Sequence, residues 1–163
     1  MPVVEIRKSR LASPDAARLI TALNAELRAT YPEPGSTHFS LSGDQVTDGQ
    51  GAFLIAYLDD VAVGCGAMRR LDESTAELKR MYVDPRVRGQ GVGRALVESL
   101  EREALALGVT RVVLETGARL ARAIRMYEGL GYGRIPLFGE YRSSPETSVC
   151  FGKSLAFGGS IGS

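Results

Sequence analysis

The segment VRGQGVGRAL, residues 87–96, combines closely spaced glycines with basic side chains and runs directly into a helical pattern. The start of a helix exposes N–H groups that lack intrahelical partners, together with the positive end of the helix dipole. Glycines at that place remove the side chains that would keep a ligand away from the backbone. The pattern therefore predicts a binding site for a phosphate or pyrophosphate group. Three arginines add positive charge to the same site: Arg86, Arg88 and Arg94.

The spacing of the glycines excludes two familiar phosphate loops. A nucleoside-triphosphate loop needs G-x-x-x-x-G-K-[ST], which the segment lacks. The dinucleotide fingerprint G-x-G-x-x-G needs a third glycine at position 94, where Arg94 stands. Gly89, Gly91 and Gly93 instead form the pattern G-x-G-x-G. A tight strand-to-helix turn without any ligand is the alternative interpretation.

The strand that precedes this segment breaks its own pattern. The adjacent Lys79 and Arg80 interrupt the two-residue alternation of an ordinary strand. Leu78 and Met81 share one face of the strand only if it carries an extra residue. This predicts a β-bulge, a feature that leaves backbone groups unpaired and is frequent beside active sites. An N–H left unpaired at this place could stabilise negative charge on a carbonyl oxygen.

Composition and charge exclude several classes of protein. The 163 residues are 44% hydrophobic and 24% charged, as in an ordinary globular domain. A net charge of +1 gives no reason to expect a nucleic-acid or membrane partner. Without a signal core or an apolar run of membrane-spanning length, a cytoplasmic protein is expected. One histidine and two distant cysteines offer no metal-ligand spacing, and Cys65 and Cys150 are expected to be buried free thiols.

Hydrophobic periodicity predicts one mixed α/β (α+β) domain over residues 1–155, followed by a disordered tail at 156–163. A central sheet of six to seven strands and about four helices is expected. The expected strands cover residues 2–7, 52–58, 61–71, 75–83, 111–116, 132–137 and 147–155. One expected helix begins at Ser13-Pro14-Asp15, and two more cover residues 94–107 and 120–130. The polar loop 31–51 has room for a short fourth helix.

Two segments carry a resemblance to a known family. The run ELKRMYVDPRVRGQGVGRAL, residues 77–96, resembles the acetyl-CoA signature R/Q-x-x-G-x-G/A of the GCN5-related N-acetyltransferase (GNAT) superfamily, with Arg88, Gly91 and Gly93 at its defined positions. The run ARAIRMYEGLGY, residues 121–132, resembles that superfamily's second signature, a helix with a tyrosine before a Gly-aromatic pair. The likeness extends over residues 52–155.

The resemblance implies the GNAT fold and acetyl-CoA as the cosubstrate, with coenzyme A as a product. Its pantetheine arm is expected to pair with the backbone at the end of the strand 75–83. Leu120 stands where the second signature often has an asparagine that holds this arm, whereas Ala123 matches its position. The implied acetyl-CoA-binding residues are Met81, Tyr82, Val83, Arg88, Gly89, Gln90, Gly91, Val92, Gly93, Arg94, Ala123 and Tyr127.

Two residues are candidates for proton transfer. Tyr127 matches the family tyrosine, and a phenol is protonated at neutral pH, so it can donate a proton or a hydrogen bond to a leaving thiolate. It also shares helical spacing with Ile124, so packing in the core is the alternative. Glu77 occupies the position of a glutamate that serves as general base in some relatives. A strand glutamate paired with Lys79 or Arg69 is the alternative.

The acceptor is less well defined by the sequence. By the resemblance, acceptor pockets draw on the early loop and on the segment before the last strand. His38 could act as a base or contact the substrate, or could be an exposed loop histidine. Arg69, Lys79 and Arg142 could pair with a substrate carboxylate. The candidate acceptor residues are Tyr31, His38, Phe39, Arg69, Phe138 and Tyr141.

The late segment PLFGEYRSSPETSVCFGKSL, residues 136–155, resembles a bacterial GNAT subgroup that acts on small molecules. We therefore expect direct acetyl transfer, in a ternary complex, to the primary amine of a small molecule such as an amino acid. Two alternatives stay open: a non-catalytic module that binds or senses acyl-CoA, and a protein or peptide N-acetyltransferase. Whether the protein forms a homodimer is also open.

Overall fold

The computed structural model describes residues 3–155, so the predicted tail lies outside the described residues. One seven-stranded sheet has the order β1-β2-β3-β4-β5-β7-β6, and every neighbouring pair is antiparallel except β4 and β5. The strands are β1 Glu5–Lys8, β2 Gly51–Leu58, β3 Val61–Arg70, β4 Thr75–Val83, β5 Arg111–Gly117, β6 Gly133–Ile135 and β7 Ser148–Ser154. The α-helices among these residues are α1 Pro14–Thr30, α2 Val92–Ala106 and α3 Ala121–Gly129.

Local sequence signals explain where several elements begin and end. At the predicted start of α1, the Ser13 side chain accepts a hydrogen bond from the Ala16 N–H at 3.2 Å, and a proline occupies the first turn. Asp59 and Asp60 both have positive φ values, 50° and 63°, as a two-residue turn between antiparallel strands requires. Gly108, at φ 83°, follows the end of α2.

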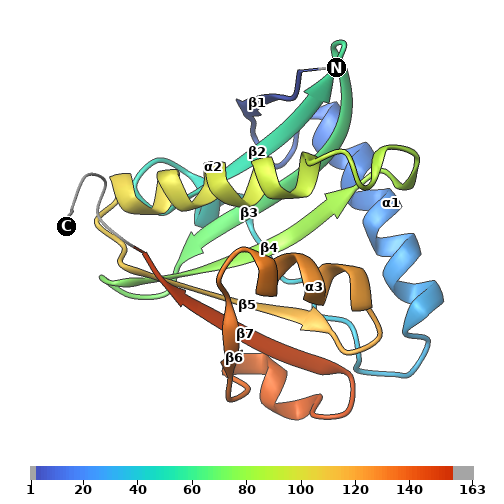
Figure 1. The fold of residues 1–163 in the computed structure, drawn as a ribbon, viewed down its shortest axis with the longest axis vertical. Helices are drawn as coiled ribbons and strands as arrows, with labels where there is room; N and C mark the ends of the chain where they lie inside the picture. Colours follow the sequence, from blue (N-terminus) through green and yellow to red (C-terminus); the bar gives the residue numbers. More distant parts are fainter. Residues whose placement is uncertain (1–2, 156–163) are drawn as a thin grey trace.

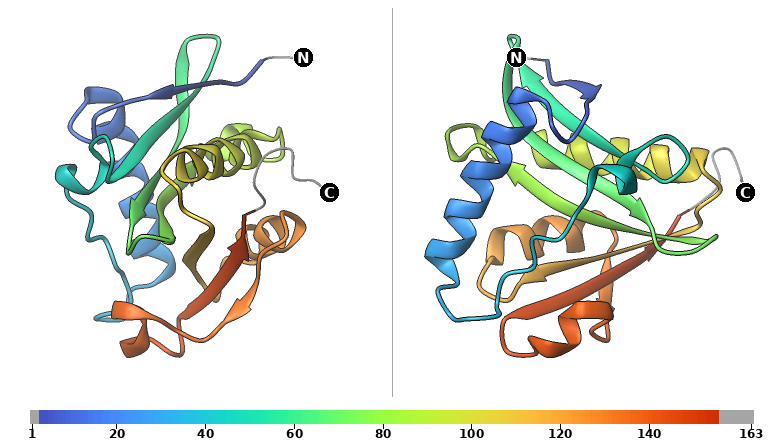
Figure 2. Two further views of the ribbon diagram at one scale, coloured as in Figure 1. Left: turned by 90° about the vertical axis from the view of Figure 1, so that its left-hand side faces the viewer. Right: turned by 180° about the vertical axis from the view of Figure 1, so that it is seen from behind.

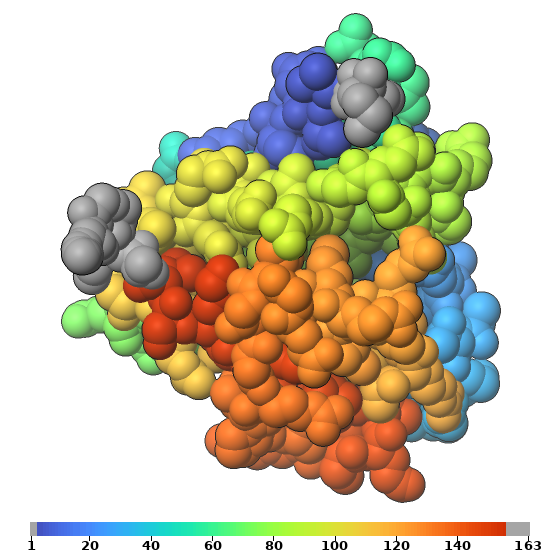
Figure 3. Space-filling model, viewed as in Figure 1, coloured from blue at the N-terminus to red at the C-terminus, as the bar shows by residue number. Residues whose placement is uncertain are grey.

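The helices cover the two faces of the sheet (Figures 1 and 2). Helices α2 and α3 pack on one face over the larger hydrophobic core, which contains Leu78, Leu96, Leu114 and Tyr127. Helix α1 packs on the opposite face over a smaller core around Phe53. The chain between α1 and β2 runs along the α1 side (Figure 2). In the space-filling view, α2 and α3 lie next to one another on their shared face (Figure 3).

Strands β4 and β5 separate toward their carboxyl ends. Their parallel pairing runs from Thr75↔Arg111 to Leu78↔Leu114 and ends there. Beyond Leu78, β4 continues to Val83 while paired with β3 alone among the strands of the sheet. Figure 1 shows the two arrowheads pointing apart. The last residues of β4 therefore present a backbone edge that β5 does not cover.

The predicted element order and fold class are confirmed, with some boundaries and the helix count changed. The described residues contain three α-helices rather than about four, because the loop 31–51 forms only the short 3-10 helix η1, Gly43–Val46. Two further 3-10 helices are η2, Pro85–Val87, and η3, Gly139–Ser143. Helix α2 begins two residues earlier than predicted, and β6 is shorter. No helix in this part of the chain has the length and apolar character needed to cross a bilayer.

Candidate active site

The start of α2 has the backbone geometry of an anion site. Gly91 is the N-cap residue in the left-handed region, at φ 86°, and the first turn carries no acidic side chain. Gly89 also has a positive φ, 85°, and a Cβ atom added at either glycine would have no neighbour within 4 Å. A phosphate group can therefore approach this backbone closely. Gly93 serves packing instead, because an added Cβ would lie 2.9 Å from the Met126 sulfur of α3.

Two of the three arginines that were predicted to add charge to this site have carboxylate partners. The guanidinium of Arg88 donates to the Val83 carbonyl at 2.9 Å and pairs with the Glu26 carboxylate of α1 at 2.8 Å. Arg86 pairs with Asp84 at 2.7 Å and holds the pKa of that carboxyl at about 2. The remaining one, Arg94, is exposed and lies 3.8 Å from Glu98.

The predicted β-bulge in β4 is confirmed. The β3–β4 register shifts between Cys65↔Tyr82 and Ala67↔Lys79, so β4 carries one extra residue opposite this part of β3. At the bulge, Arg80 adopts the left-handed backbone conformation, with a φ of 59°. The Cys65 thiol donates to the Arg80 carbonyl at 3.3 Å, which satisfies a carbonyl displaced from the ladder. Burial raises the pKa of this thiol to about 12, so it stays protonated.

The edge of β4 beyond the bulge fits an extended ligand. Met81, Tyr82 and Val83 are half-buried, and β5 pairs with none of them. Strand residues present N–H and C=O groups toward an absent neighbour, so an amide-containing chain such as pantetheine can hydrogen-bond there. This edge leads from the bulge toward η2 and the anion site at the start of α2. The backbone therefore offers one continuous line of polar groups for a pantetheine arm and its phosphates.

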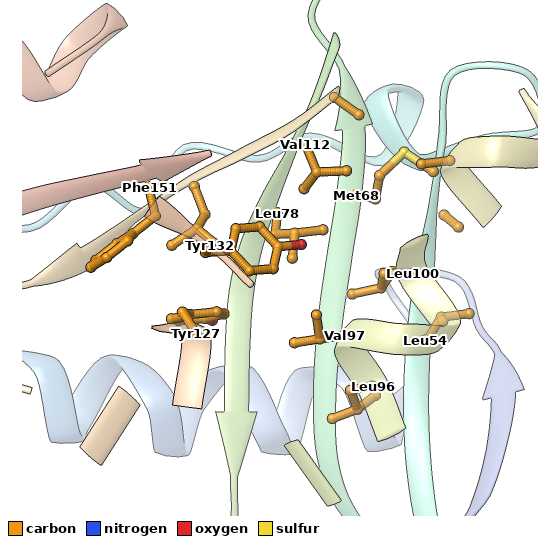
Figure 4. Packing of buried hydrophobic residues seen from close by; sticks show 14 of the residues in the cluster. Leu54, Met68, Leu78, Leu96, Val97, Leu100, Val112, Tyr127, Tyr132 and Phe151 are labelled. Atoms are coloured by element: carbon orange, nitrogen blue, oxygen red, sulfur yellow. The ribbon is translucent and has the colours of Figure 1, made fainter. Parts of the chain in front are cut away.

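Tyr127 lies on the α2–α3 side of the sheet. Its side chain belongs to the large core and packs edge-to-face against Tyr132, with the ring centroids 5.8 Å apart (Figure 4). Burial, with a smaller contribution from Glu115, raises the pKa of the phenol above its ordinary value. Tyr127 is thus protonated at neutral pH and can act there only as a proton or hydrogen-bond donor. The packing interpretation is confirmed, and the role of Tyr127 as a proton or hydrogen-bond donor stays a prediction.

Helix α3 carries the second signature, and Ala123 matches the family pattern while Leu120 departs from it. Leu120 is the N-cap residue of α3 and makes no side-chain capping hydrogen bond. Ala123 is partly buried against the large core, where a small side chain leaves α3 close to the sheet. An asparagine amide is therefore absent from the start of α3.

Glu77 lies on the opposite face of the sheet from Tyr127 and is 1% exposed. Its Oε1 atom accepts hydrogen bonds from Arg69 at 2.9 and 3.1 Å. Its Oε2 atom accepts one from the Tyr141 hydroxyl at 2.5 Å. The predicted pairing with Arg69 is therefore present, while Lys79 pairs with Glu140 at 3.2 Å instead. Both oxygens of this candidate base are already hydrogen-bonded.

A second carboxylate near the strand separation was missed by the sequence reasoning. Glu115 follows Leu114, the last β5 residue paired with β4, and accepts a hydrogen bond from Ser148 at 2.6 Å. Burial raises the pKa of this carboxyl above its ordinary value. The available signal was a lone acid directly after the apolar run VVL of this strand, at a place where an unpaired charge is costly.

His38 is held in place rather than exposed, which corrects one of the expectations. Its side chain is 10% exposed, with Nδ1 3.2 Å from Glu140 and Nε2 2.9 Å from the Ser144 hydroxyl. Its ring packs edge-to-face on Tyr141 at 5.0 Å, and Phe138 packs on the same tyrosine at 5.2 Å. The structure thus brings three predicted acceptor residues together around the hydroxyl that binds Glu77.

The other predicted acceptor residues have different surroundings. Phe39 contacts two guanidinium groups, with its ring centroid 5.1 Å from that of Arg28 and 4.9 Å from that of Arg80. Tyr31 does not join this cluster: it is buried at the end of α1, and its hydroxyl accepts a hydrogen bond from the Arg119 N–H at 2.7 Å. An added Cβ at Gly117 would overlap the Tyr31 ring, so this tyrosine packs α1 against the chain after β5.

Comparisons with known proteins agree with this geometry. The model of the acetyltransferase (GNAT) family matches residues 17–132. An IAA acetyltransferase of Azospirillum brasilense is 34% identical over 146 residues, which cover 89% of this chain and 94% of the relative. The human N-acetylaspartate synthetase is 41% identical over 81 residues, which cover 49% of this chain and 27% of that protein.

Solved structures share the fold over nearly the whole chain. A protein from Klebsiella pneumoniae subsp. pneumoniae, classed as an acyl-CoA N-acyltransferase, has a TM-score of 0.81 and 30% identity, covering 94% of this chain and 99% of its own. An acetyltransferase from Streptococcus agalactiae has a TM-score of 0.73 and 25% identity, covering 93% and 98%. The chain belongs to the GNAT acetyltransferase family. It is an acetyltransferase, and acetyl-CoA is its cosubstrate.

Proposed function

We propose that this enzyme transfers the acetyl group of acetyl-CoA directly to the primary amine of a small molecule, within a ternary complex. The observation that carries the proposal is the arrangement around the open edge of β4. Tyr127 packs in the core on the α2–α3 face of the sheet, and the Glu77–Tyr141 pair lies on the other face, where Glu77 is one residue before the end of the β4–β5 pairing. A donor for the leaving group and an acceptor for the amine proton are thus separated by the strand edge that suits the thioester arm.

The transfer needs a balanced set of proton movements. A bond forms between the amine nitrogen and the acetyl carbonyl carbon, and the bond from that carbon to sulfur breaks. One proton leaves the protonated amine before attack and a second leaves the nitrogen after it. The carboxylate side of the site takes each proton in turn and releases it to solvent, and Tyr127 donates a hydrogen bond to the departing thiolate, which takes up one proton and leaves as the coenzyme A thiol. Cys65 and Cys150 are buried free thiols, as expected from the sequence, and have no role as nucleophiles here.

We assign the proton acceptor to Glu77, acting with Tyr141. Because the Tyr141 hydroxyl already donates to Oε2 of Glu77, an amine proton can reach the carboxylate through that hydroxyl or through a water that replaces it. Glu115 is the competing base, since its raised pKa makes it better matched to a protonated amine. The N–H groups of the bulge, at Arg80 and Met81, are assigned to the developing negative charge on the carbonyl oxygen.

A small acceptor is supported by the burial of the acceptor-side groups. Glu77, Tyr141 and Lys79 are each at most 5% exposed, which suits a compact molecule that enters the domain. The names of two relatives also denote small molecules: N-acetylaspartate synthetase, and a mycothiol acetyltransferase of Beutenbergia cavernae that is 31% identical over 127 residues. We also propose a cytoplasmic location, where free thiols such as Cys65 stay reduced.

The deciding experiment measures coenzyme A thiol release from acetyl-CoA with a panel of free amines, amino acids and short peptides. We expect free small amines to accelerate release and peptides to do so much less. Acceleration by peptides alone would favour a protein N-acetyltransferase. Tight binding of acetyl-CoA without acceleration by any amine would favour a non-catalytic binding module.

A further inference from the structure

We propose that Arg80 binds a carboxylate group of the acceptor, so that the preferred substrates carry an acid as well as the amine to be acetylated. The inference rests on the proposed function, because it concerns the acceptor of that same reaction. It depends on one unusual feature of the described residues. Arg80 is a buried cation whose charge no carboxylate neutralises.

The neighbouring buried cations do have acidic partners. Arg69 pairs with Glu77 at 2.9 Å, and Lys79 pairs with Glu140 at 3.2 Å. Arg80 is 8% exposed, and within residues 3–155 no carboxylate oxygen lies within 4.0 Å of its nitrogens. Its hydrogen-bond partner is the neutral side-chain oxygen of Asn24 in α1. Among the described residues, the charge of Arg80 is thus buried beside a neutral hydrogen-bond acceptor and beside no carboxylate.

The surroundings add positive charge rather than cancel it. The guanidinium groups of Arg80 and Arg28 both lie over the Phe39 ring, 4.9 and 5.1 Å from its centroid. Burial and the charge of Arg28 both lower the pKa of Arg80. Arginine nevertheless keeps its proton in proteins. A buried cation of this kind is stabilised when an anion joins it.

The guanidinium retains donors that a ligand can reach. A guanidinium has five N–H donors, and the bond to Asn24 uses one of them. No fully enclosed side-chain nitrogen or oxygen of the described residues lacks a hydrogen-bond partner. The Nε and Nη1 atoms of Arg80, which have no partner among these residues, therefore remain accessible to solvent. One of these nitrogens, together with the Nη2 hydrogen that the bond to Asn24 leaves free, can bind one carboxylate in a bidentate manner.

The position of Arg80 connects this contact with the reaction. Arg80 is the bulge residue itself, held at φ 59°, and its neighbour Met81 begins the open edge assigned to the thioester arm. A non-glycine residue in the left-handed region is strained, and such strain persists where the surroundings require it. The same bend therefore frees the backbone for the thioester and turns the Arg80 side chain toward α1 and Phe39. A carboxylate bound by Arg80 would hold the amine of the same molecule beside the thioester.

The test compares acids with their neutral counterparts. Thiol release from acetyl-CoA is measured with glycine, L-alanine, L-phenylalanine, β-alanine and 4-aminobutyrate, and with the carboxamide of each. The variants are Arg80→Gln, Asn24→Ala and Arg102→Gln. Arg102 is exposed on α2, so its substitution removes the same charge away from the site. Asn24→Ala removes the structural hydrogen bond while it leaves the guanidinium in place.

We expect the wild-type enzyme to prefer at least one acid over its carboxamide, and Arg80→Gln to lower kcat/KM for that acid by about 10- to 100-fold. Activity on the carboxamide should stay within about threefold, and both Asn24→Ala and Arg102→Gln should keep the preference for the acid. Wild-type activity that is equal on acids and carboxamides would overturn the inference while the proposed function stands. An equal loss on both in Arg80→Gln, reproduced by Asn24→Ala, would assign Arg80 a structural role instead.

A binding measurement keeps the two proposals separate. The melting temperature of the protein saturated with coenzyme A is titrated with the same acids, which needs no turnover. Stabilisation by an acid that Arg80→Gln abolishes supports the inference even if no amine is acetylated, in which case the proposed function alone fails. If no acid in the set raises the wild-type melting temperature, the assignment of a carboxylate site is wrong.

Discussion

The Tyr141 hydroxyl donates a 2.5 Å hydrogen bond to Oε2 of Glu77, which joins η3 to a strand 64 residues earlier in the chain. The hydrogen bond is buried, and the negatively charged partner raises the pKa of Tyr141 together with burial. It leaves the candidate base without a free oxygen, because Arg69 occupies the other one. We therefore propose that the carboxylate receives a proton through the groups that donate to it. The segment before β7 supplies Tyr141 to this side of the site.

Gly91→Glu is expected to abolish binding of coenzyme A. The glycine has φ 86° at the N-cap of α2, so the variant strains the turn and brings a negative charge to the predicted phosphate site. Isothermal titration calorimetry with acetyl-CoA measures the loss. Gly108→Glu is the matched control, since Gly108 has φ 83° and equally open surroundings at the far end of α2. Unchanged affinity in Gly91→Glu would contradict the phosphate assignment.

Tyr127→Phe is expected to lower kcat by about 100-fold with little change in the affinity for acetyl-CoA. The variant keeps the packing of the ring and removes the hydroxyl assigned to the leaving sulfur. Tyr132→Phe serves as the control, because this neighbouring core tyrosine donates its hydroxyl to Glu101 at 2.7 Å, away from the open edge of β4. Steady-state kinetics with a chosen amine separate the two. Full turnover in Tyr127→Phe would make that tyrosine a core residue only.

Glu77→Gln is expected to lower kcat/KM for the amine by about 100-fold while acetyl-CoA still binds. The amide keeps a similar shape but accepts no proton. The matched variant is Glu115→Gln, which removes the competing carboxylate and should cost less activity. The pH dependence of kcat/KM is measured for both, and the acid limb should disappear in Glu77→Gln. If it disappears in Glu115→Gln instead, the base is Glu115.

Glu115→Gln is expected to change how stability depends on pH. Burial raises the pKa of Glu115, so the folded protein holds this proton more tightly than the unfolded chain does. The stabilising effect of the protonated form is complete below the ordinary glutamate pKa of about 4.3, and it is lost as pH rises through the higher folded pKa. Relative to wild type, Glu115→Gln should therefore gain stability as pH rises from 4 to 8. Melting temperatures of both proteins across this range provide the measurement, and a constant difference would refute the prediction.

Much of the predicted acetyl-CoA site could be inferred from short segments of the sequence. The interrupted alternation at Lys79 and Arg80 predicted the bulge, because the face of a strand residue is fixed by its position relative to its neighbours. Glycines before a helical pattern predicted the free N–H groups at the start of α2, because these groups belong to a few consecutive residues of the chain. The capped start of α1 was predicted for the same reason.

What the sequence determined by itself is therefore the backbone: the order of strands and helices, the bulge, and the turn that opens α2. Only the tertiary structure decided how the charges pair. It turns Arg88 to Glu26, 62 residues away, and leaves Arg80 without an acid among the described residues. Backbone conformation depends on neighbours in the chain, whereas the partner of a charged side chain depends on which distant segments the packing of the sheet and helices brings within hydrogen-bond distance.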